Sequence, residues 1–401
     1  GGVVGTDMLV VSSSLKLNVG DVGVFTLNDI GTSTYFTPYA GSQAFIKYDE
    51  VNMKAQAIFD LYPNINDVYT QIENILTTKP KEIKRYEVKS NNKNHRGEAT
   101  PVITNLSPST LSAGTYSLLT ITGTDFGSTA GSVEFPDADD GGATFITADA
   151  TLIQSWSDTE ITIFVPTGAT SGNIAVINST AERGESTDEI TVPFNISGIN
   201  NSFIHLADYT PDLVDNNGFG GYTFTFSDNY FLNSDAVDRY DEVIEQWRCE
   251  SGINWNSNGS STTSTTCEGF DGINIVTFDD VCGLPAGVLG TAFSFYNACG
   301  TGGVAYWRVS ELDIKFDLAT NWNYTLNSPT FSEFDFYSVM LHEMGHAHQL
   351  GHTPEVSDVM YFSISNGTEK RALTANNVSA INLVMSRNNA NELAYNGSTG
   401  G

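Results

Sequence analysis

Basic residues are scarce in this chain, and their scarcity excludes several kinds of partner. The 401 residues include 18 lysines and arginines against 47 aspartates and glutamates, a formal net charge of −29 at pH 7. Nucleic acids and anionic membrane surfaces are bound through clustered Lys and Arg. We therefore expect neither as a partner. The acidic excess instead suits a solvated surface and calcium binding.

Long apolar runs are missing as well. No run of about 18 apolar residues, the length that spans a bilayer, occurs in the sequence, so no membrane span is expected. Residues 1–5 (GGVVG) have neither the charged lead nor the cleavage pattern of a signal peptide, so we expect a secreted protein to be present as a processed chain. Hydrophobic residues still make up 40% of the chain and aromatic residues 11%, enough for cores in two or three domains.

Cysteine is rare and confined to one stretch. The four cysteines are Cys249, Cys267, Cys282 and Cys299. No pair has C-x-x-C spacing, which argues against a cysteine metal site. Two disulfides in an oxidising compartment are the better interpretation, and three pairings are open. We expect Cys249–Cys267 and Cys282–Cys299, because neighbouring cysteines close short loops.

The chemistry of the chain is concentrated between residues 332 and 362. His342, Glu343 and His346 form the pattern H-E-x-x-H. Imidazoles four residues apart lie on one face of a helix and can share one cation, and zinc suits neutral imidazole. Glu343 lies beside that metal without being a ligand, so it can accept a proton from a water whose pKa the metal lowers to about 7. Ser332, three residues before Asp335, predicts the start of this helix.

Two later residues extend the pattern. His352 follows His346 by six residues, where a turn could bring a third imidazole to the metal, and Met360 follows His352 by eight. The run resembles the metzincin signature H-E-x-x-H-x-x-G-x-x-H with its Met-turn, and is most similar to the matrixin branch. The resemblance implies an α+β catalytic domain, a mixed sheet plus an active-site helix. It also implies His342, His346 and His352 as Zn²⁺ ligands, Glu343 as general base and Met360 as an apolar floor.

The resemblance has one departure and further implications. Gln349 stands where the family has a glycine with φ > 0, so the turn is either redrawn or strained there. In matrixins the strand corresponding to 290–296 forms the sheet edge above the cleft and pairs with the peptide substrate; the alternative is an ordinary core strand. The implied substrate-binding residues are Gly290, Thr291, Ala292 and Phe293. Matrixins often require structural Ca²⁺, and the candidate ligands are Asp279, Asp280, Asp313 and Asp317, which could equally be surface acids.

Residues 100–197 have a different pattern. Alternating runs at Leu118–Thr122, Ile161–Val165 and Asn173–Asn178 are separated by glycine turns, which predicts a β-sandwich. The amino-acid sequence from Pro101 onwards resembles the immunoglobulin-like IPT/TIG family, notably in ITGTDFG at 121–127 and SWSDTEI at 155–161. Such domains are usually spacers or binding modules.

The remaining segments complete a multidomain organisation. Residues 1–89 are predicted to form a small α+β domain, a pro-domain or spacer, with helices at Tyr48–Leu61 and Ile65–Leu76. A linker follows at 90–99, then the immunoglobulin-like domain at 100–197, the catalytic domain at 198–387 and a flexible tail at 388–401. The catalytic domain should contain a helix capped by Ser234, strands at 272–278, 288–296 and 311–316, and a last helix at 375–385.

These observations predict a secreted zinc endopeptidase, extracellular or on the cell surface of a bacterium, that acts on proteins or peptides. The domain arrangement resembles that of secreted peptidases of gliding bacteria. The alternative is an adhesion or matrix-binding protein with an impaired or latent metzincin site, which the departure at Gln349 allows. The sequence specifies neither the substrate nor the oligomeric state.

Overall fold

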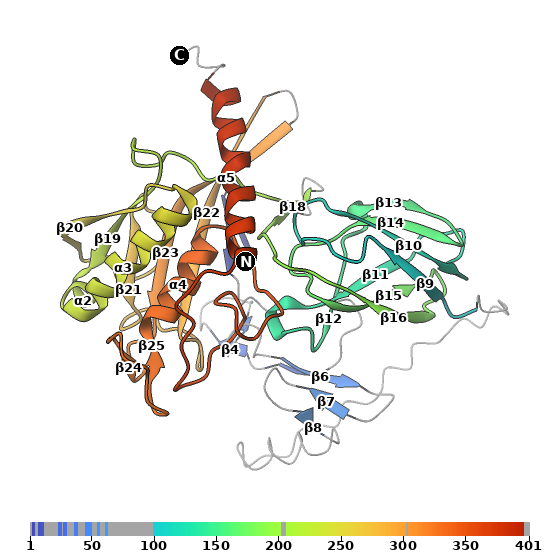
Figure 1. Ribbon diagram of the computed structural model, residues 1–401, viewed down its shortest axis with the longest axis horizontal. Helices are drawn as coiled ribbons and strands as arrows, with labels where there is room; N and C mark the ends of the chain where they lie inside the picture. The colour runs from blue at the N-terminus through green and yellow to red at the C-terminus, as the bar shows by residue number, and fades with distance from the viewer. Residues whose placement is uncertain are drawn as a thin grey trace. The chain divides into compact units, whose positions relative to one another are not determined.

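The computed structural model describes residues 99–201, 206–301 and 304–396, together with the backbone of short strands between residues 2 and 62 (Figure 1). The chain divides into two compact units. One contains Gly1–Ser12 and Glu98–Gly401, and the other contains Ser13–Gly97. None of the described helices is long and apolar enough to cross a membrane.

The smaller unit contains strands where the sequence predicted a helix. One sheet has the strand order β3-β6-β7-β8, and a second pairs β4 with β5. The strands are β3 (Gly23–Phe25), β4 (Leu27–Asp29), β5 (Phe36–Pro38), β6 (Phe45–Asp49), β7 (Lys54–Gln56) and β8 (Leu61–Tyr62). The helix predicted over 48–61 is therefore wrong, because β6 and β7 pair antiparallel there, and FIKYD is rich in strand-forming residues. The helix predicted at 65–76 lies outside the described residues.

The immunoglobulin-like domain is a sandwich of two four-stranded antiparallel sheets, as predicted. Their orders are β13-β14-β10-β9 and β12-β11-β15-β16. The elements are β9 (Val102–Ser107), β10 (Leu118–Thr124), β11 (Ser132–Pro136), η2 (Ala138–Asp140), β12 (Phe145–Thr147), η3 (Ala150–Leu152), β13 (Ile153–Trp156), β14 (Glu160–Phe164), β15 (Gly172–Ile177) and β16 (Arg183–Ile190). Inward-facing side chains such as Ile121, Phe135 and Ile163 are fully buried and form one core between the sheets.

The catalytic domain is built on a seven-stranded mixed sheet with the order β1-β2-β22-β23-β21-β19-β20. Its later strands are β19 (Thr223–Ser227), β20 (Asn256–Thr263), β21 (Asn274–Phe278), β22 (Gly290–Thr301) and β23 (Val304–Phe316). β19, β20, β21 and β23 are parallel, whereas β22 runs antiparallel to β23. Short pairs also join β17 (Ile199–Asn201) to β18 (Leu206–Tyr209), and β24 (Trp322–Asn323) to β25 (Phe334–Asp335).

The first two strands of this sheet come from the start of the chain. β1 (Gly2–Val4) pairs with β2 (Asp7–Val11), and β2 pairs antiparallel with β22, from Met8 opposite Tyr296 to Val11 opposite Phe293. Residues 1–12 therefore belong to the larger unit. This differs from the predicted N-terminal domain of residues 1–89, because strand pairing over such a distance leaves no local sequence signal.

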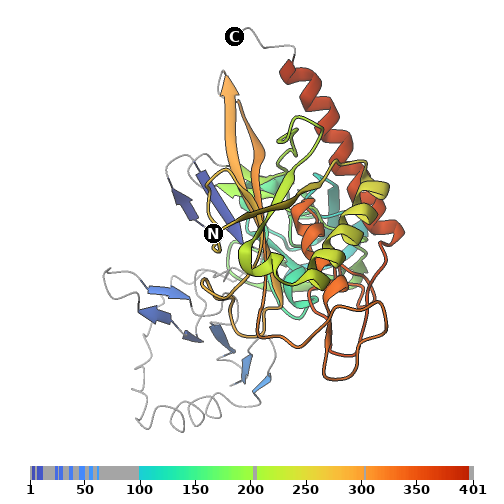
Figure 2. The same ribbon diagram turned by 90° about the vertical axis from the view of Figure 1, so that its left-hand side faces the viewer.

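The long helices lie on one side of the catalytic sheet (Figure 2). They are α3 (Ser234–Ser251), α4 (Phe336–Ala347) and α5 (Ala375–Asn396), and a short α2 (Asp228–Phe231) precedes them. The cap of α3 is Asn233, one residue before the predicted Ser234. α5 continues through 388–396, so that part of the predicted loose tail is helical.

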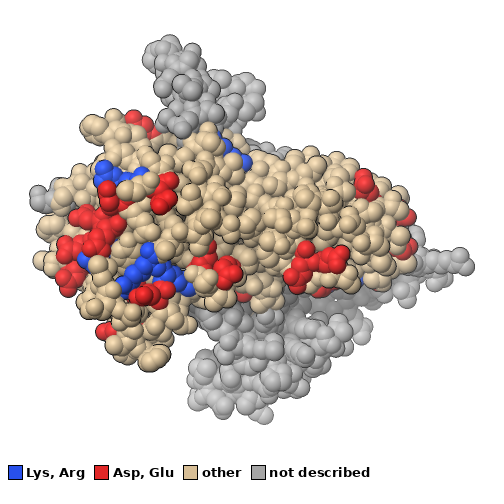
Figure 3. Space-filling model, viewed as in Figure 1, with Lys and Arg blue, Asp and Glu red and all other residues tan. Residues whose placement is uncertain are grey.

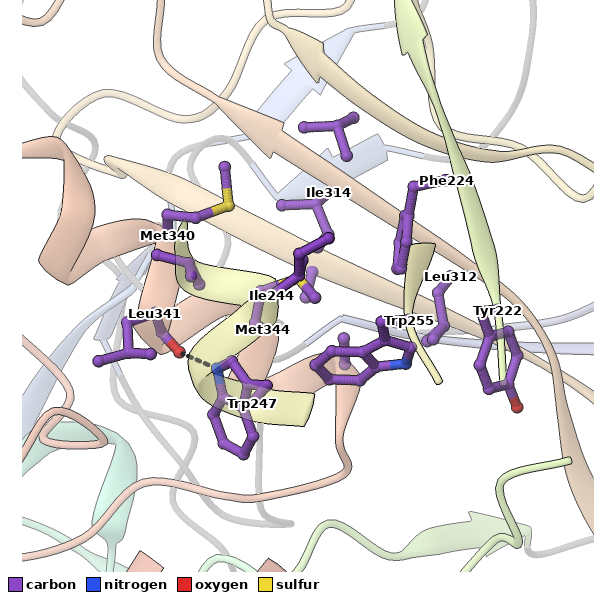
Figure 4. Close-up of a cluster of buried hydrophobic side chains, with 14 of the residues drawn as sticks. Tyr222, Phe224, Ile244, Trp247, Trp255, Leu312, Ile314, Met340, Leu341 and Met344 are labelled. Carbon is purple, nitrogen blue, oxygen red and sulfur yellow. Dashed lines mark hydrogen bonds between the residues drawn. The ribbon is translucent and has the colours of Figure 1, made fainter. Parts of the chain in front are cut away.

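The helix that carries the H-E-x-x-H pattern is held by buried apolar contacts. Trp247 of α3 donates from Nε1 to the backbone oxygen of Leu341 in α4 at 3.3 Å. Figure 4 shows Ile244 of α3 and Met344 of α4 in the same cluster as Ile314 of β23. All these side chains are almost completely buried. Since burial of each large apolar side chain contributes about 1.5–3 kcal/mol, this cluster fixes α4 against α3 and the sheet.

The charged surface reflects the composition. On the face shown in Figure 3, acidic side chains lie in several separate patches, with broad uncharged areas between them. This distribution suits a solvated surface.

Candidate metal centre

The helix of the H-E-x-x-H pattern begins with a buried cap. The cap is Asp335, whose Oδ2 accepts a hydrogen bond from the backbone N–H of Ser338 at 3.0 Å. Asp335 also accepts from Nε of Arg371 at 2.9 Å. The predicted cap, Ser332, is three residues too early: Ser332 lies in the preceding turn, where its Oγ contacts Thr330.

Three imidazoles converge at the far end of this helix, as predicted. His342 Nε2 and His346 Nε2 are 3.0 Å apart, and His346 Nε2 and His352 Nε2 are 3.1 Å apart. Among the described residues, His342, His346 and His352 are the group of potential ligands close enough together to hold a metal ion. Tetrahedral zinc with nitrogens at about 2.0–2.1 Å needs nitrogen–nitrogen separations of about 3.3 Å, so the spacing fits.

The hydrogen bonds of the Nδ1 atoms show why a cation fits between the Nε2 atoms. His342 Nδ1 lies 2.7 Å from the carbonyl oxygen of Val359, and His346 Nδ1 lies 2.9 Å from that of Leu350. A carbonyl can only accept, so each Nδ1 carries the proton and each neutral ring presents an Nε2 lone pair. Two lone pairs at 3.0 Å cannot bond to each other, and a shared Zn²⁺ resolves this arrangement. Burial and the neighbouring rings also lower the pKa of His346 to about 3 and that of His342 well below its usual value.

The turn that brings His352 to the site contains the departure at Gln349. Gln349 has φ = 68°, the left-handed conformation that the family's glycine would adopt, so the glutamine backbone is strained. Its fully buried side chain is well bonded. Nε2 donates to Ser294 Oγ at 3.0 Å and to the carbonyl of Ala347 at 3.1 Å, while Oε1 accepts from Tyr296 Oη at 3.0 Å. The glutamine therefore links the third-ligand turn to β22.

Met360 lies against the helix, and its implied role as an apolar floor under the metal stays a prediction. It is fully buried, and a Cβ added at Gly345 would lie 2.3 Å from the Met360 sulfur. Thr353 N donates to the carbonyl of Met360 at 3.0 Å, which ties the turn around Met360 to the segment just after His352. Gly345 therefore allows a close approach between the helix and the Met-turn.

Glu343 lies between the helix and the end of β22. Its carboxylate accepts a backbone hydrogen bond from Ala292, while burial raises its pKa to about 8. A Cβ added at Gly290 would lie 2.9 Å from Glu343 Cγ, so only glycine fits there without displacing Glu343. Oε2 of Glu343 is buried and has no hydrogen-bond partner among the described residues, an arrangement that leaves it available to a reacting molecule.

The predicted substrate-binding residues lie at the start of β22. Gly290, Thr291, Ala292 and Phe293 all pair with β23 on one side. On the other side, the pairing with β2 begins at Phe293 and continues to Tyr296. The edge expected over 290–296 is therefore covered in part by another strand of the same chain.

The remaining candidates lie apart from the imidazoles. Asp279, Asp313 and Asp317 accept backbone hydrogen bonds, for example from Leu284, Ile275 and Ala319 at 2.8, 3.1 and 3.2 Å, and calcium binding at these residues and Asp280 stays a prediction. His348 is not part of the cluster. Its buried ring lies 5.4 Å from that of Trp247 and 5.6 Å from that of Trp255.

The predicted cysteine pairing is wrong. Cys267 bonds to Cys282, their Cα atoms 5.4 Å apart and their positions separated by 15 residues. Cys249 is exposed and outside this disulfide, in the last turns of α3 with its Sγ 3.8 Å from Glu245. Cys267 and Cys282 lie before and after β21, whereas Cys249 belongs to α3 and Cys299 to β22.

Sequence reasoning missed one residue at the site. Oδ1 of Asp139 lies 2.9 Å from Nδ1 of His352, across 213 residues of sequence. Asp139 belongs to the turn after β11 in the immunoglobulin-like domain. The acidic run DADD at 137–140 was the available signal, but no spacing rule connects it to a histidine so distant.

Comparison with known families agrees with the geometry. Residues 286–385 match the matrixin family, and residues 101–194 match the IPT/TIG domain family. The chain therefore carries a matrixin metalloendopeptidase domain preceded by an IPT/TIG domain. No curated protein matches the chain.

Solved structures resemble only part of the chain. An auxiliary nutrient binding protein from Bacteroides ovatus ATCC 8483 is 14% identical over 27% of this chain and 25% of its own, with a TM-score of 0.19. Another from Bacteroides thetaiotaomicron VPI-5482 is 16% identical over 26% of this chain and 24% of its own, also at 0.19. A structure with a xylogluco-oligosaccharide is 24% identical over 25% of this chain and 20% of its own, again at 0.19. Similarity at this level supports no functional argument.

Proposed function

We propose that this protein is a secreted zinc-dependent endopeptidase that hydrolyses peptide bonds of extracellular proteins. One observation carries the proposal: a buried carboxylate, Glu343, directly follows His342 on the helix that supplies two of three imidazoles whose Nε2 atoms converge. A site that only bound zinc would have no need of a carboxylate with an unpartnered oxygen next to the ligands.

The residues present account for the chemistry of hydrolysis. Zinc held by His342, His346 and His352 would supply Lewis acidity, which activates water and polarises a peptide carbonyl. Glu343 acts as general base. Burial raises its pKa to about 8, but the charge of a bound Zn²⁺ would favour the ionised carboxylate, which accepts the proton of the attacking water and later donates it to the leaving amine. The N–H of Ala292 holds this carboxylate in place, and the close approach of Gly290 limits its movement.

A peptide substrate is proposed to bind along β22. Gly290 and Ala292 come directly beside Glu343, so a strand added at the start of β22 would place a peptide bond near the general base. Main-chain hydrogen bonds make little demand on the substrate's sequence, which suits an endopeptidase. Secretion is supported by the disulfide Cys267–Cys282, since such bonds persist in oxidising compartments.

Cleavage of denatured casein by the wild type and by Glu343→Ala tests the proposal. Loss of a general base should reduce the rate roughly 10²-fold or more, while zinc content stays at one ion per chain because Glu343 is not a ligand. Glu250→Ala, an exposed carboxylate at the end of α3, is the matched control and should cleave like the wild type. A wild type that holds zinc but cuts neither casein nor gelatin would contradict the proposal and favour the adhesion alternative.

A further inference from the structure

A carboxylate of the immunoglobulin-like domain contacts one of the three imidazoles. Asp139 Oδ1 and His352 Nδ1 are 2.9 Å apart, and their side chains are 30% and 11% exposed. A carboxylate accepts, so Nδ1 of His352 carries the proton and its Nε2 lone pair faces the other two rings. Of the three histidines, His342 and His346 donate to backbone carbonyls, whereas His352 donates to a carboxylate.

Hydrogen bonds and burial fix the conformation of the turn that carries Asp139. Asp137 caps it by accepting from the N–H of Asp139 at 2.9 Å. Asp140 accepts from the N–H groups of Gly142 and Ala143 at 3.1 and 2.8 Å. Ala138 is buried and bonds to the carbonyl of Gly168 at 2.8 Å. With both ends of the turn fixed, Asp139 meets His352 without ordering a flexible loop.

The same turn meets the catalytic domain at a second point. Gly141, with φ = 72°, packs so closely that an added Cβ would lie 3.0 Å from the ring of Phe362 and 3.0 Å from the hydroxyl of Tyr361. Both residues directly follow Met360. The contact between Asp139 and His352 is therefore one part of a packed surface.

The C-terminal end of the immunoglobulin-like domain holds the other side of the third-ligand turn. The N–H of Gly351 donates to the carbonyl of Asn195 at 2.8 Å, and the N–H of Ser197 donates to the carbonyl of Gln349 at 2.9 Å. Between these two hydrogen bonds, Ile196 and Leu350 pair as an antiparallel β-bridge. The segment leading into His352 is thus paired with residues 195–197.

We propose that Asp139 is a positioning residue of the metal centre, which orients His352 and makes the IPT/TIG domain part of the active site. A carboxylate behind a metal-ligating histidine fixes its tautomer and ring orientation and raises its basicity, and loss of such a partner costs about 10–100-fold in metal affinity. The proposal rests on the proposed zinc chemistry, but it concerns how tightly the site holds the metal.

The test measures zinc affinity of the full chain by competition with a chelator. Asp139→Ala should bind zinc about 10–100-fold more weakly than the wild type. Asp139→Asn keeps an accepting oxygen, so its loss should be smaller. Asp188→Ala removes an exposed carboxylate from the same domain and should leave the affinity unchanged. The absorption spectrum of the cobalt-substituted protein, which reports ligand geometry, should shift in Asp139→Ala and stay constant in Asp188→Ala.

The outcomes separate this proposal from the peptidase proposal. If Asp139→Ala binds zinc within twofold of the wild type and its cobalt spectrum is unchanged, Asp139 has no positioning role, even if the wild type cleaves casein. If Asp139→Ala loses affinity while the wild type cleaves nothing, the positioning role stands and the peptidase proposal fails. Circular dichroism of the zinc-free variants should match that of the wild type, which shows that they fold. If Asp139→Ala misfolds, Asp139→Asn is tested in its place. An unchanged zinc affinity and an unchanged cobalt spectrum in Asp139→Asn would then overturn the proposal.

Discussion

At the scale of single residues, Gln349 combines an unfavourable backbone with favourable side-chain bonds. Gln349→Gly would relieve a left-handed backbone that costs about 1 kcal/mol or more. It would also remove the bonds to Tyr296, Ser294 and Ala347, each worth about 1 kcal/mol, and leave buried groups unpaired. We expect a net destabilisation of about 2 kcal/mol, measured by urea unfolding of the zinc-free protein.

A second substitution separates the two contributions. Gln349→Ala keeps the strain and loses the same bonds, so it should be less stable than Gln349→Gly by about 1 kcal/mol. A Gln349→Gly variant as stable as the wild type would show that the side-chain bonds do no more than offset the strain.

Asp313 makes the stability of the catalytic domain depend on pH. This carboxyl of β23 is 2% exposed, and burial raises its pKa to about 8, although the N–H groups of Gly269 and Ile275 oppose the shift. Glu311 and Asp271 raise the pKa further. An unfolded chain releases this proton near pH 3.9. From about pH 4 to about pH 8 the folded state therefore binds more protons, and this contribution to stability falls as pH rises.

Asp313→Asn removes that titration. Its stability relative to the wild type should increase between about pH 5 and about pH 8, measured by urea unfolding in the presence of EGTA. A difference that is the same at both pH values contradicts the assignment. Repeating the measurement with added calcium tests the calcium prediction, since a bound ion would stabilise the ionised wild type and not the variant.

Residue spacing brought the three histidines of the site together, but it did not predict their contacts with distant segments. His342, His346 and His352 lie in one short segment, where helix geometry and turn length bring them together. The strain at Gln349 was also predictable, because the family's glycine implies positive φ. Asp139 was not, because its contact with His352 depends on how two domains meet.

At the scale of elements, β2 occupies part of the edge that a substrate is proposed to use. Its backbone pairs with Phe293–Tyr296, next to Gly290 and Ala292 beside Glu343. A variant without residues 1–12 should therefore cleave peptides faster. We expect roughly tenfold higher kcat/KM, the equivalent of about 1.4 kcal/mol of competing strand pairing.

The matched control is the same deletion combined with Glu343→Ala, which should stay inactive. An unchanged or lower kcat/KM, with the unfolding midpoint preserved, would show that β2 does not compete with the substrate.

Elements with a strong periodic pattern were predictable, and contacts between distant elements were not. The sandwich strands β10, β14 and β15 follow from alternation, α3 and α5 from helical stripes, and α4 from the H-E-x-x-H pattern. The pairing of β2 with β22 and the disulfide Cys267–Cys282 depend on folded distances. The helix predicted over 48–61 failed because strand pairing overrode a helical spacing of apolar residues.

At the scale of the whole molecule, zinc binding should stabilise contacts of the immunoglobulin-like domain as well as the site itself. The third-ligand turn is paired with Asn195–Ser197 and bonded to Asp139, so a metal that orders the turn should also order these contacts. At a free zinc concentration about a hundredfold above Kd, binding stabilises the folded site by about 2.7 kcal/mol. Amides that exchange only when the site opens should then exchange up to about a hundredfold more slowly.

Hydrogen exchange with and without zinc measures this coupling. In the wild type we expect zinc to slow the amides of 138–144 and of 195–197 as well as those of the turn at 349–352. In Asp139→Ala the effect on 138–144 should disappear, while that on 195–197 persists, because the backbone bonds to Gln349 and Gly351 remain. If zinc slows only the catalytic domain, the IPT/TIG domain is an energetically separate spacer, since coupling between the domains requires that both respond to the same ligand.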